Sequence, residues 1–149
     1  KRTIDNTLNK AIKPDSPCSN EQLFYASDIC SEALEAARKN ADLGGVGKMI
    51  HWERRNFFTL RQEDVFRLHP VSGKDRFLVL NPPYGKRLEI DAPFYKKLFY
   101  HLQKHFSHWK ILVLLPTYVH WEDFPLSPCK HLVFRHGGLR IQALVLEPD

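Results

Sequence analysis

The stretch FLVLNPPYG at residues 77–85 contains the clearest structural signal in the sequence. Its first four residues, Phe77–Leu80, are all apolar and predict a strand that is buried on both faces. A polar loop with two prolines follows at once, and Asp91 and Pro93 are typical of the start of a helix that runs to about Phe106. A buried strand, a loop and a helix in this order predict an α/β fold, in which ligands bind where parallel strands end.

The same alternation of strand and helix is found upstream of this stretch. We predict strands over residues 23–27 and 48–52, joined by a helix over residues 32–42 that Ser31 caps. Residues 1–12 have the apolar spacing of a short helix, and a loop rich in proline and serine follows them to about residue 20. Two parallel strands joined by a helix are the expected outcome of this pattern.

Downstream, the chain is expected to end in antiparallel structure. We predict a strand over residues 111–115 and then a hairpin of strands 131–134 and 139–146, which turns at Gly137 and Gly138. The whole chain is therefore predicted to form a mostly parallel sheet with an antiparallel hairpin at its end.

Composition limits the classes of function. The 149 residues include 22 Lys and Arg against 17 Asp and Glu, a net charge of +5 that mildly favours an anionic partner such as nucleic acid. The three cysteines form no CxxC pair and no even disulfide set, which favours a reducing compartment. No apolar run approaches the length needed to span a bilayer, so we expect a cytoplasmic protein without membrane contact.

The loop after the 77–80 strand has the residues for binding an amino group. An amide oxygen of Asn81 and a nearby main-chain carbonyl can accept both hydrogens of an exocyclic amino group, which turns the nitrogen lone pair toward an electrophile. Pro82 and Pro83 stiffen the backbone and remove two donors. Tyr84 offers a flat face on which a flipped base can stack. The alternative interpretation is a proline-rich turn with an exposed tyrosine.

Asn81-Pro82-Pro83-Tyr84 in this place resembles the catalytic motif of class I S-adenosylmethionine-dependent methyltransferases that alkylate amino nitrogens. With the following residues 85–88, it resembles the RNA methylases associated with THUMP domains, notably the large-subunit rRNA guanine-N2 enzymes. The resemblance implies a Rossmann-like sheet of order 3-2-1-4-5-7-6, S-adenosyl-L-methionine as cofactor, ribosomal RNA as partner and Asn81, Pro82, Pro83 and Tyr84 as catalytic residues.

The resemblance also implies where the cofactor binds. Asp28 matches the acidic residue that binds the ribose hydroxyls of the cofactor, and Ile29 the apolar residue that packs on its adenine. Residues 52–58 resemble the end of the family's third strand, where an aspartate contacts the adenine amino group. Asn56 stands in that place beside Phe57, so the charge is absent and weaker cofactor binding is expected; Asn81 also borders the cofactor. For Asp28 and Asn56 an ordinary polar turn is the alternative.

One expected part of the family's catalytic domain is missing from the sequence. A first strand followed by a glycine-rich loop should precede Asp28, and the only glycine-rich stretch, residues 44–47, follows a helix instead. We therefore expect residues 1–149 to form the downstream part of one catalytic domain, which an upstream part of the same polypeptide completes. The 149 residues alone are expected to be poorly stable, because the missing strand lies at the centre of the implied sheet.

Three other interpretations remain open. The fold can serve as a non-catalytic RNA-binding or assembly module, or the enzyme can methylate adenine N6 in DNA or a protein glutamine. We predict no metal site: His101, His105 and His108 have helical spacing, yet a solvated helix face is favoured over metal ligation. Arg54 and Arg55 are likewise interpreted as solvating residues. The oligomeric state is left open.

Overall fold

The computed structural model describes residues 24–68, 76–83, 92–124 and 127–148. The chain divides into two compact units, residues 1–57 and 58–149, and each is described by itself. The proposed N-terminal helix, residues 1–12, and Tyr84 lie outside the described residues.

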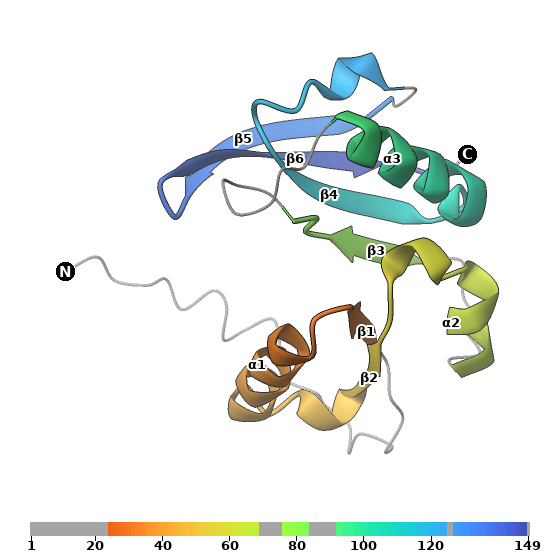
Figure 1. Ribbon diagram of the computed structural model, residues 1–149, viewed down its shortest axis with the longest axis vertical. Coiled ribbons are helices and arrows are strands. Elements are labelled where there is room, and N and C mark those ends of the chain that lie inside the picture. The colour runs from red at the N-terminus through yellow and green to blue at the C-terminus, as the bar shows by residue number, and fades with distance from the viewer. Residues whose placement is uncertain (1–23, 69–75, 84–91, 125–126, 149) are drawn as a thin grey trace. The chain divides into compact units, whose positions relative to one another are not determined.

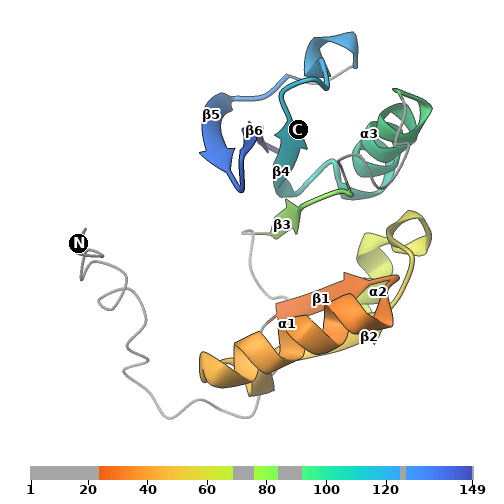
Figure 2. The same ribbon diagram turned by 60° about the vertical axis from the view of Figure 1, so that its left-hand side comes forward.

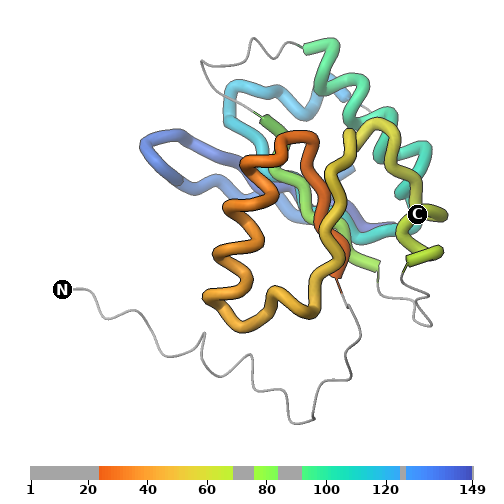
Figure 3. The backbone as a smooth tube through the Cα atoms, turned by 60° about the horizontal axis from the view of Figure 1, so that its bottom comes forward, coloured from red at the N-terminus to blue at the C-terminus, as the bar shows by residue number. Residues whose placement is uncertain are grey.

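The first unit is a strand–helix–strand motif. Strand β1 (Phe24–Asp28) pairs in parallel with β2 (Ile50–Arg54), and the register sets Asp28 opposite Arg54. Helix α1 (Ser31–Leu43) and the 3-10 turn η2 (Gly47–Met49) return the chain from the end of β1 to the start of β2 (Figure 3). The predicted strands and helix are confirmed, each shifted by one or two residues.

The second unit is built on a four-stranded sheet of order β3-β4-β6-β5 (Figure 1). Strand β3 (Phe77–Leu80) runs parallel to β4 (Lys110–Pro116), while β6 (Leu139–Leu146) runs antiparallel to both β4 and β5 (Lys130–His136). This order agrees with the 4-5-7-6 part of the implied sheet. The described strands do not form the single, mostly parallel sheet that was predicted: they form two sheets, and only the β3–β4 pair of the four-stranded sheet is parallel. Gly137 and Gly138 form the hairpin turn at φ angles of 56° and 83°, a region that favours glycine.

Helix α3 (Ala92–Phe106) lies on one side of this sheet (Figure 2). Its fully buried side chains include Leu98, Phe99, Leu102 and Phe106, and alternate residues of β4 are buried as well. The remaining elements of the unit are the short helix α2 (Gln62–Leu68) and the 3-10 turns η3 (Phe57–Thr59, which starts at the boundary between the units) and η4 (Trp121–Asp123).

All hydrophobic residues that are buried in the described structure belong to the second unit, between Leu60 and Leu144. In the first unit, among residues 24–57, Leu34 and Ala37 of α1 are only half-buried and Ala33 is exposed. The molecule therefore has its core under α3, and the first unit depends on its short parallel ladder and on polar contacts.

Three local predictions are wrong. Strand β3 is not buried on both faces, because Phe77 and Val79 are 62% and 67% exposed and only Leu78 and Leu80 are half-buried. Ser31 does not cap α1: Cys30 occupies the capping position, no side chain caps the helix, and the Ser31 hydroxyl contacts Glu32 instead. His101 does not lie on a solvated helix face, because it is 8% exposed and its Nε2 bonds the Leu60 carbonyl at 2.9 Å. The apolar face of α3 is wide enough to include it.

Candidate active site

Asp28 lies exposed at the carboxyl end of β1, where the chain turns into α1. Its Oδ1 accepts a hydrogen bond from the Cys30 backbone N–H at 2.8 Å, which orients the carboxylate over the turn. Ile29 beside it is 60% exposed. Hydrogen bonding from the Cys30 thiol, chiefly, holds the pKa of Glu32 below its usual value. The turn thus presents two carboxylates and one exposed apolar side chain to an incoming molecule.

The end of β2 fixes this turn from the neighbouring strand. The Arg54 Nε donates to the Ile29 carbonyl at 3.1 Å, and the Arg55 backbone N–H donates to the Asp28 carbonyl at 2.9 Å. Sequence analysis assigned both arginines a solvating role, and this is wrong for Arg54, whose guanidinium holds the main chain of the candidate site. Only the strand register, which pairs Asp28 with Arg54, could have shown the contact in advance.

Asn56 and Phe57 follow directly after β2, with Asn56 exposed and Phe57 half-buried. The first unit therefore brings Asp28, Ile29, Asn56 and Phe57 to the carboxyl ends of two adjacent parallel strands. This is the edge at which open α/β sheets bind their ligands.

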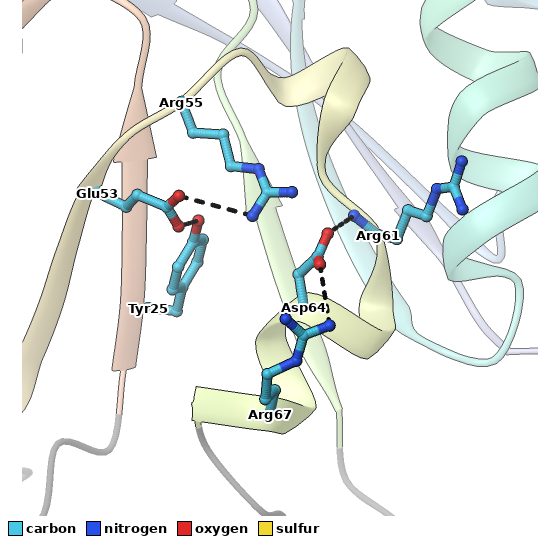
Figure 4. A network of polar contacts seen from close by, with 6 residues as sticks. All are labelled: Tyr25, Glu53, Arg55, Arg61, Asp64 and Arg67. Atoms are coloured by element: carbon cyan, nitrogen blue, oxygen red, sulfur yellow. Dashed lines mark hydrogen bonds and ion pairs between the residues drawn. The ribbon is translucent and has the colours of Figure 1, made fainter.

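A polar network covers one face of the two-stranded sheet (Figure 4). The Tyr25 hydroxyl donates to Glu53 Oε2 at 2.5 Å, and Arg55 Nη1 lies 3.6 Å from Glu53 Oε1. Burial first, and then Glu53, raise the pKa of Tyr25 to about 12. The Tyr25 ring also stacks on His51 at a centroid distance of 5.8 Å. These contacts hold the ends of β1 and β2 in register.

A second polar cluster in Figure 4 belongs to the other unit and caps α2. Asp64 Oδ2 accepts from the Arg61 backbone N–H at 3.1 Å, and Asp64 Oδ1 lies 3.9 Å from Arg67 Nη2. A carboxylate that accepts from the residue three positions earlier satisfies an N–H that has no helical partner. The cluster stabilises a helix of only seven residues that sequence analysis did not predict.

In the second unit, residues 81–83 follow β3 and form a segment with a restricted backbone at the carboxyl end of that strand. Pro82 is buried, while Asn81 before it and Pro83 after it are exposed. Neither proline has an N–H to pair, and their φ angles are restricted. The backbone is therefore anchored at Pro82 and leaves the Asn81 side chain open to solvent, as an amide that binds a ligand requires.

A residue that sequence analysis missed supports the neighbouring loop. Gln142 of β6 is 4% exposed, and its Nε2 donates to the carbonyls of Pro116 at 3.2 Å and Val119 at 2.6 Å. The Thr117 backbone N–H donates to the Arg140 carbonyl at 3.1 Å. The loop that leaves the carboxyl end of β4 is thus fastened to β6. The available signal was a glutamine within the otherwise apolar run of residues 141–146.

The predicted site residues fall into two groups by unit. The cofactor candidates Asp28, Ile29, Asn56 and Phe57 lie in the first unit, and the amino-group candidates Asn81, Pro82 and Pro83 lie in the second. Each group occupies the carboxyl end of parallel strands, which is the edge at which open α/β sheets bind ligands.

Solved structures share this fold. A methylase described as possible, from Clostridium difficile, superimposes with a TM-score of 0.68 at 23% identity and covers 97% of this chain and 35% of its own. A methyltransferase structure solved in complex with SAH has a TM-score of 0.68 at 19% identity, again over 97% of this chain and 35% of its own. At this level of identity the likeness defines the class of fold, that of the methyltransferases.

A family model, the RMKL-like methyltransferase domain, matches residues 2–123. The chain therefore belongs to the RMKL-like methyltransferase family. A ribosomal RNA large subunit methyltransferase K/L from Psychromonas ingrahamii is 35% identical over 94 residues, which cover 61% of this chain and 12% of that protein. The chain thus spans a small part of the relative's length. Among the described residues, no helix is long and apolar enough to cross a membrane.

Proposed function

We propose that this chain forms the downstream part of a catalytic domain that methylates a base amino nitrogen in RNA, with guanine N2 of large-subunit ribosomal RNA as the favoured target. The observation that supports this most is the conformation of residues 81–83 after β3. There Pro82 is buried while the Asn81 amide is exposed at the carboxyl edge of the sheet. The similarity to a large-subunit ribosomal RNA methyltransferase favours RNA over DNA or protein.

The roles of the second unit's residues follow from their chemistry. The Asn81 side-chain oxygen and the Pro82 carbonyl accept the two hydrogens of the amino group, so the nitrogen lone pair points away from both acceptors. Pro82 and Pro83 keep the two acceptors from separating, because neither residue can rotate freely about φ. Tyr84 stacks on the flipped base. Positioning and lone-pair orientation supply most of the acceleration, and no covalent enzyme intermediate is needed.

The first unit fits the cofactor that the family implies. The exposed Asp28 carboxylate has lone pairs left for two hydroxyl hydrogens, since only one hydrogen bond, from Cys30, engages it within the described residues. Ile29 provides apolar surface for an adenine ring, and Asn56 and Phe57 line the end of the next strand. S-adenosyl-L-methionine, when bound, supplies an electrophilic methyl group. The family resemblance assigns Asn81 to the cofactor as well as to the amino group.

Calorimetric titration of S-adenosyl-L-methionine tests the cofactor half of the proposal. We would titrate this chain, a form extended upstream through the expected glycine-rich loop, and the extended form with Asp28→Ala. Binding by the extended form, weakened about tenfold or more by Asp28→Ala, is the expected result, because a charged hydrogen bond contributes about 1.5–3 kcal/mol. Failure of both forms to bind would remove the cofactor and with it the catalytic proposal.

Transfer of a labelled methyl group tests the second part of the proposed function, namely methylation of a base amino group in RNA. The extended form is offered ribosomal RNA, DNA and a glutamine-containing protein, so that the three substrate classes compete in one assay. Asn81→Ala should reduce the rate on RNA by about 100-fold or more, as expected when a positioned acceptor is lost. An unchanged rate would show that Asn81 does not hold the amino group.

The second candidate function is a non-catalytic RNA-binding or assembly module. Asn56, which replaces a charged residue at the adenine-binding position, favours it. In that case RNA binds but S-adenosyl-L-methionine binds neither form of the protein, and the calorimetric titration separates the two functions directly.

A further inference from the structure

The terminal hairpin is exposed along β5 and its turn, and all of its Lys, Arg, Asp and Glu residues are cations. Every residue from Cys129 to Arg140 is exposed, including all of β5. The hairpin sequence from Lys130 to Leu146 contains Lys130, Arg135, Arg140 and two histidines and has no Asp or Glu. A solvated edge strand normally mixes charges of both signs, so a run of one sign suggests an anionic partner.

The strand register places two of these cations directly opposite each other. Arg135 of β5 pairs with Arg140 of β6, and the pair His136 and Leu139 separates them from the Gly137-Gly138 turn. Like charges at opposed positions destabilise an antiparallel pair. Within the described part of the chain, the ion pairs and side-chain hydrogen bonds do not involve either guanidinium. An external anion between the two side chains would remove this repulsion.

The two arginines lie at the same edge of the sheet as Asn81. Strands β3 and β4 are parallel, so both end at this edge, and β6 starts there because it runs antiparallel to β4. The Arg140 carbonyl accepts from Thr117, the first residue after β4. Two strand spacings and about three residues along β6 separate Asn81 from Arg140, which amounts to roughly 15 Å. In Figure 1 the turn between β5 and β6 and the carboxyl end of β3 both lie toward the left-hand edge of the sheet.

We propose that Arg135 and Arg140 bind the phosphate backbone of the substrate RNA beside the nucleotide whose base reaches Asn81. The proposal rests on the proposed function, since it takes RNA as the substrate. Paired guanidinium groups match phosphate geometry in a bidentate way and carry no sequence information, so the hairpin positions the RNA while Asn81 reads the amino group.

The test uses Arg135→Glu in the upstream-extended form, with a fluorescently labelled RNA stem-loop as the probe. This substitution turns an opposed pair of like charges into an opposed pair of unlike charges, so the thermal midpoint of the variant should not fall and is expected to rise. RNA affinity measured by anisotropy should nevertheless drop about tenfold or more at about 50 mM salt. The slope of log K against log salt should decrease by about one, as for one lost phosphate contact.

Lys104→Glu is the matched control, because it makes the same change in net charge at an exposed residue of the second unit. Lys104 lies in the last turn of α3, which leads into the start of β4 and thus into the opposite edge of the sheet. The control should bind RNA within about twofold of the parent with an unchanged salt slope. Equal losses in Lys104→Glu and Arg135→Glu would show only a long-range charge effect and would overturn the proposal.

Two further variants complete the test. Arg135→Lys keeps the charge and should recover most of the salt slope. The double variant Arg135→Glu, Arg140→Glu should bind RNA no better than Arg135→Glu and should lose the thermal stability that the single variant gains, because two like charges are again opposed. RNA affinity that Arg135→Glu leaves unchanged refutes the hairpin contact even if the parent methylates RNA. Conversely, salt-dependent binding that requires the arginines supports the hairpin contact even if the parent methylates nothing and the proposed function fails.

Discussion

Replacement of Gln142 by leucine tests whether the hydrogen bonds from Gln142 to the loop after β4, called the Gln142 clamp below, stabilise the second unit. The buried Gln142 amide donates to two main-chain carbonyls, those of Pro116 and Val119. Leucine has nearly the same volume and no donor, so the substitution removes both hydrogen bonds without leaving a large cavity. The result therefore reports on the hydrogen bonds rather than on packing.

The expected loss can be worked from these two contacts. The Val119 carbonyl is left without its Gln142 donor, which costs about 1–3 kcal/mol. The Pro116 carbonyl keeps the hydrogen bond from the Val119 backbone N–H at 3.1 Å, so its lost bond costs only about 0.5–1.5 kcal/mol. The more apolar leucine side chain offsets about 1–2 kcal/mol of this by its burial. We expect Gln142→Leu to lower the free energy of unfolding by about 1–2 kcal/mol, which corresponds to a thermal midpoint roughly 3–8 °C lower.

Gln142→Glu adds a dependence on pH with a defined sign. The buried carboxyl faces two carbonyls, so burial raises its pKa in the folded state above the value of about 4.3 in the unfolded state. Below about pH 4 both states are protonated and the carboxylic acid donates one of the two hydrogen bonds. As the pH rises from about 4.3 to the raised folded pKa, the unfolded state alone releases its proton, so stability falls across this window.

Urea unfolding of the upstream-extended form, followed by tryptophan fluorescence at several pH values, gives both quantities. A Gln142→Leu variant that unfolds within about 0.5 kcal/mol of the parent would refute the Gln142 clamp, because the two carbonyls would then have water as an adequate partner. A Gln142→Glu variant whose difference from the parent does not change with pH would refute the burial argument.

Three other substitutions have defined outcomes. The pKa of Tyr25 is raised to about 12, so between about pH 10 and about pH 12 the unfolded state releases this proton first and the free energy of unfolding falls. Tyr25→Phe should make that fall smaller, as measured by urea unfolding at alkaline pH. Tyr95→Phe is the comparison, because the pKa of Tyr95 is also raised to about 12. His101→Ala should cost about 2–4 kcal/mol in urea unfolding through the lost bond to Leu60 and lost packing, and His101→Gln should recover part of it. Gly138→Ala, at a φ of 83°, should cost about 1–2 kcal/mol in thermal unfolding, whereas Gly44→Ala, at a φ of −78°, should leave stability nearly unchanged; equal effects would contradict the role of φ.

The fold of the second unit could be predicted largely from local patterns. Phe77–Leu80 is uniformly apolar and adjoins a proline loop, and the hairpin has paired glycines between two strand-like runs. Helix α2 was not predicted because it is short and depends on distant partners: the Phe66 ring stacks on Trp109 at 5.8 Å, and the Arg76 guanidinium lies 4.5 Å from the Phe66 centroid. Such contacts leave no trace in a local window of sequence.

The positions of candidate site residues could be predicted where they depend only on the order of elements along the chain. Asp28 and Asn81 follow strands directly, so their place at a sheet edge follows from the order of elements alone. The contacts of Arg54 and Gln142 depend on which residue of one strand faces which residue of another. A shift of the register by one residue would move either side chain to the opposite face, and no property of the single strand fixes that choice.

The absence of buried hydrophobic residues between Phe24 and Phe57 has a consequence for cooperativity. Local opening free energies follow the burial of apolar surface, so amide hydrogens of β1 and β2 should exchange with solvent faster than those of β4 and β6. A ligand that binds at the Asp28 turn only when the first unit is folded adds its own binding free energy to the stability of that unit. Occupancy of the proposed cofactor site would then set the fraction of molecules in which β1 and β2 are paired.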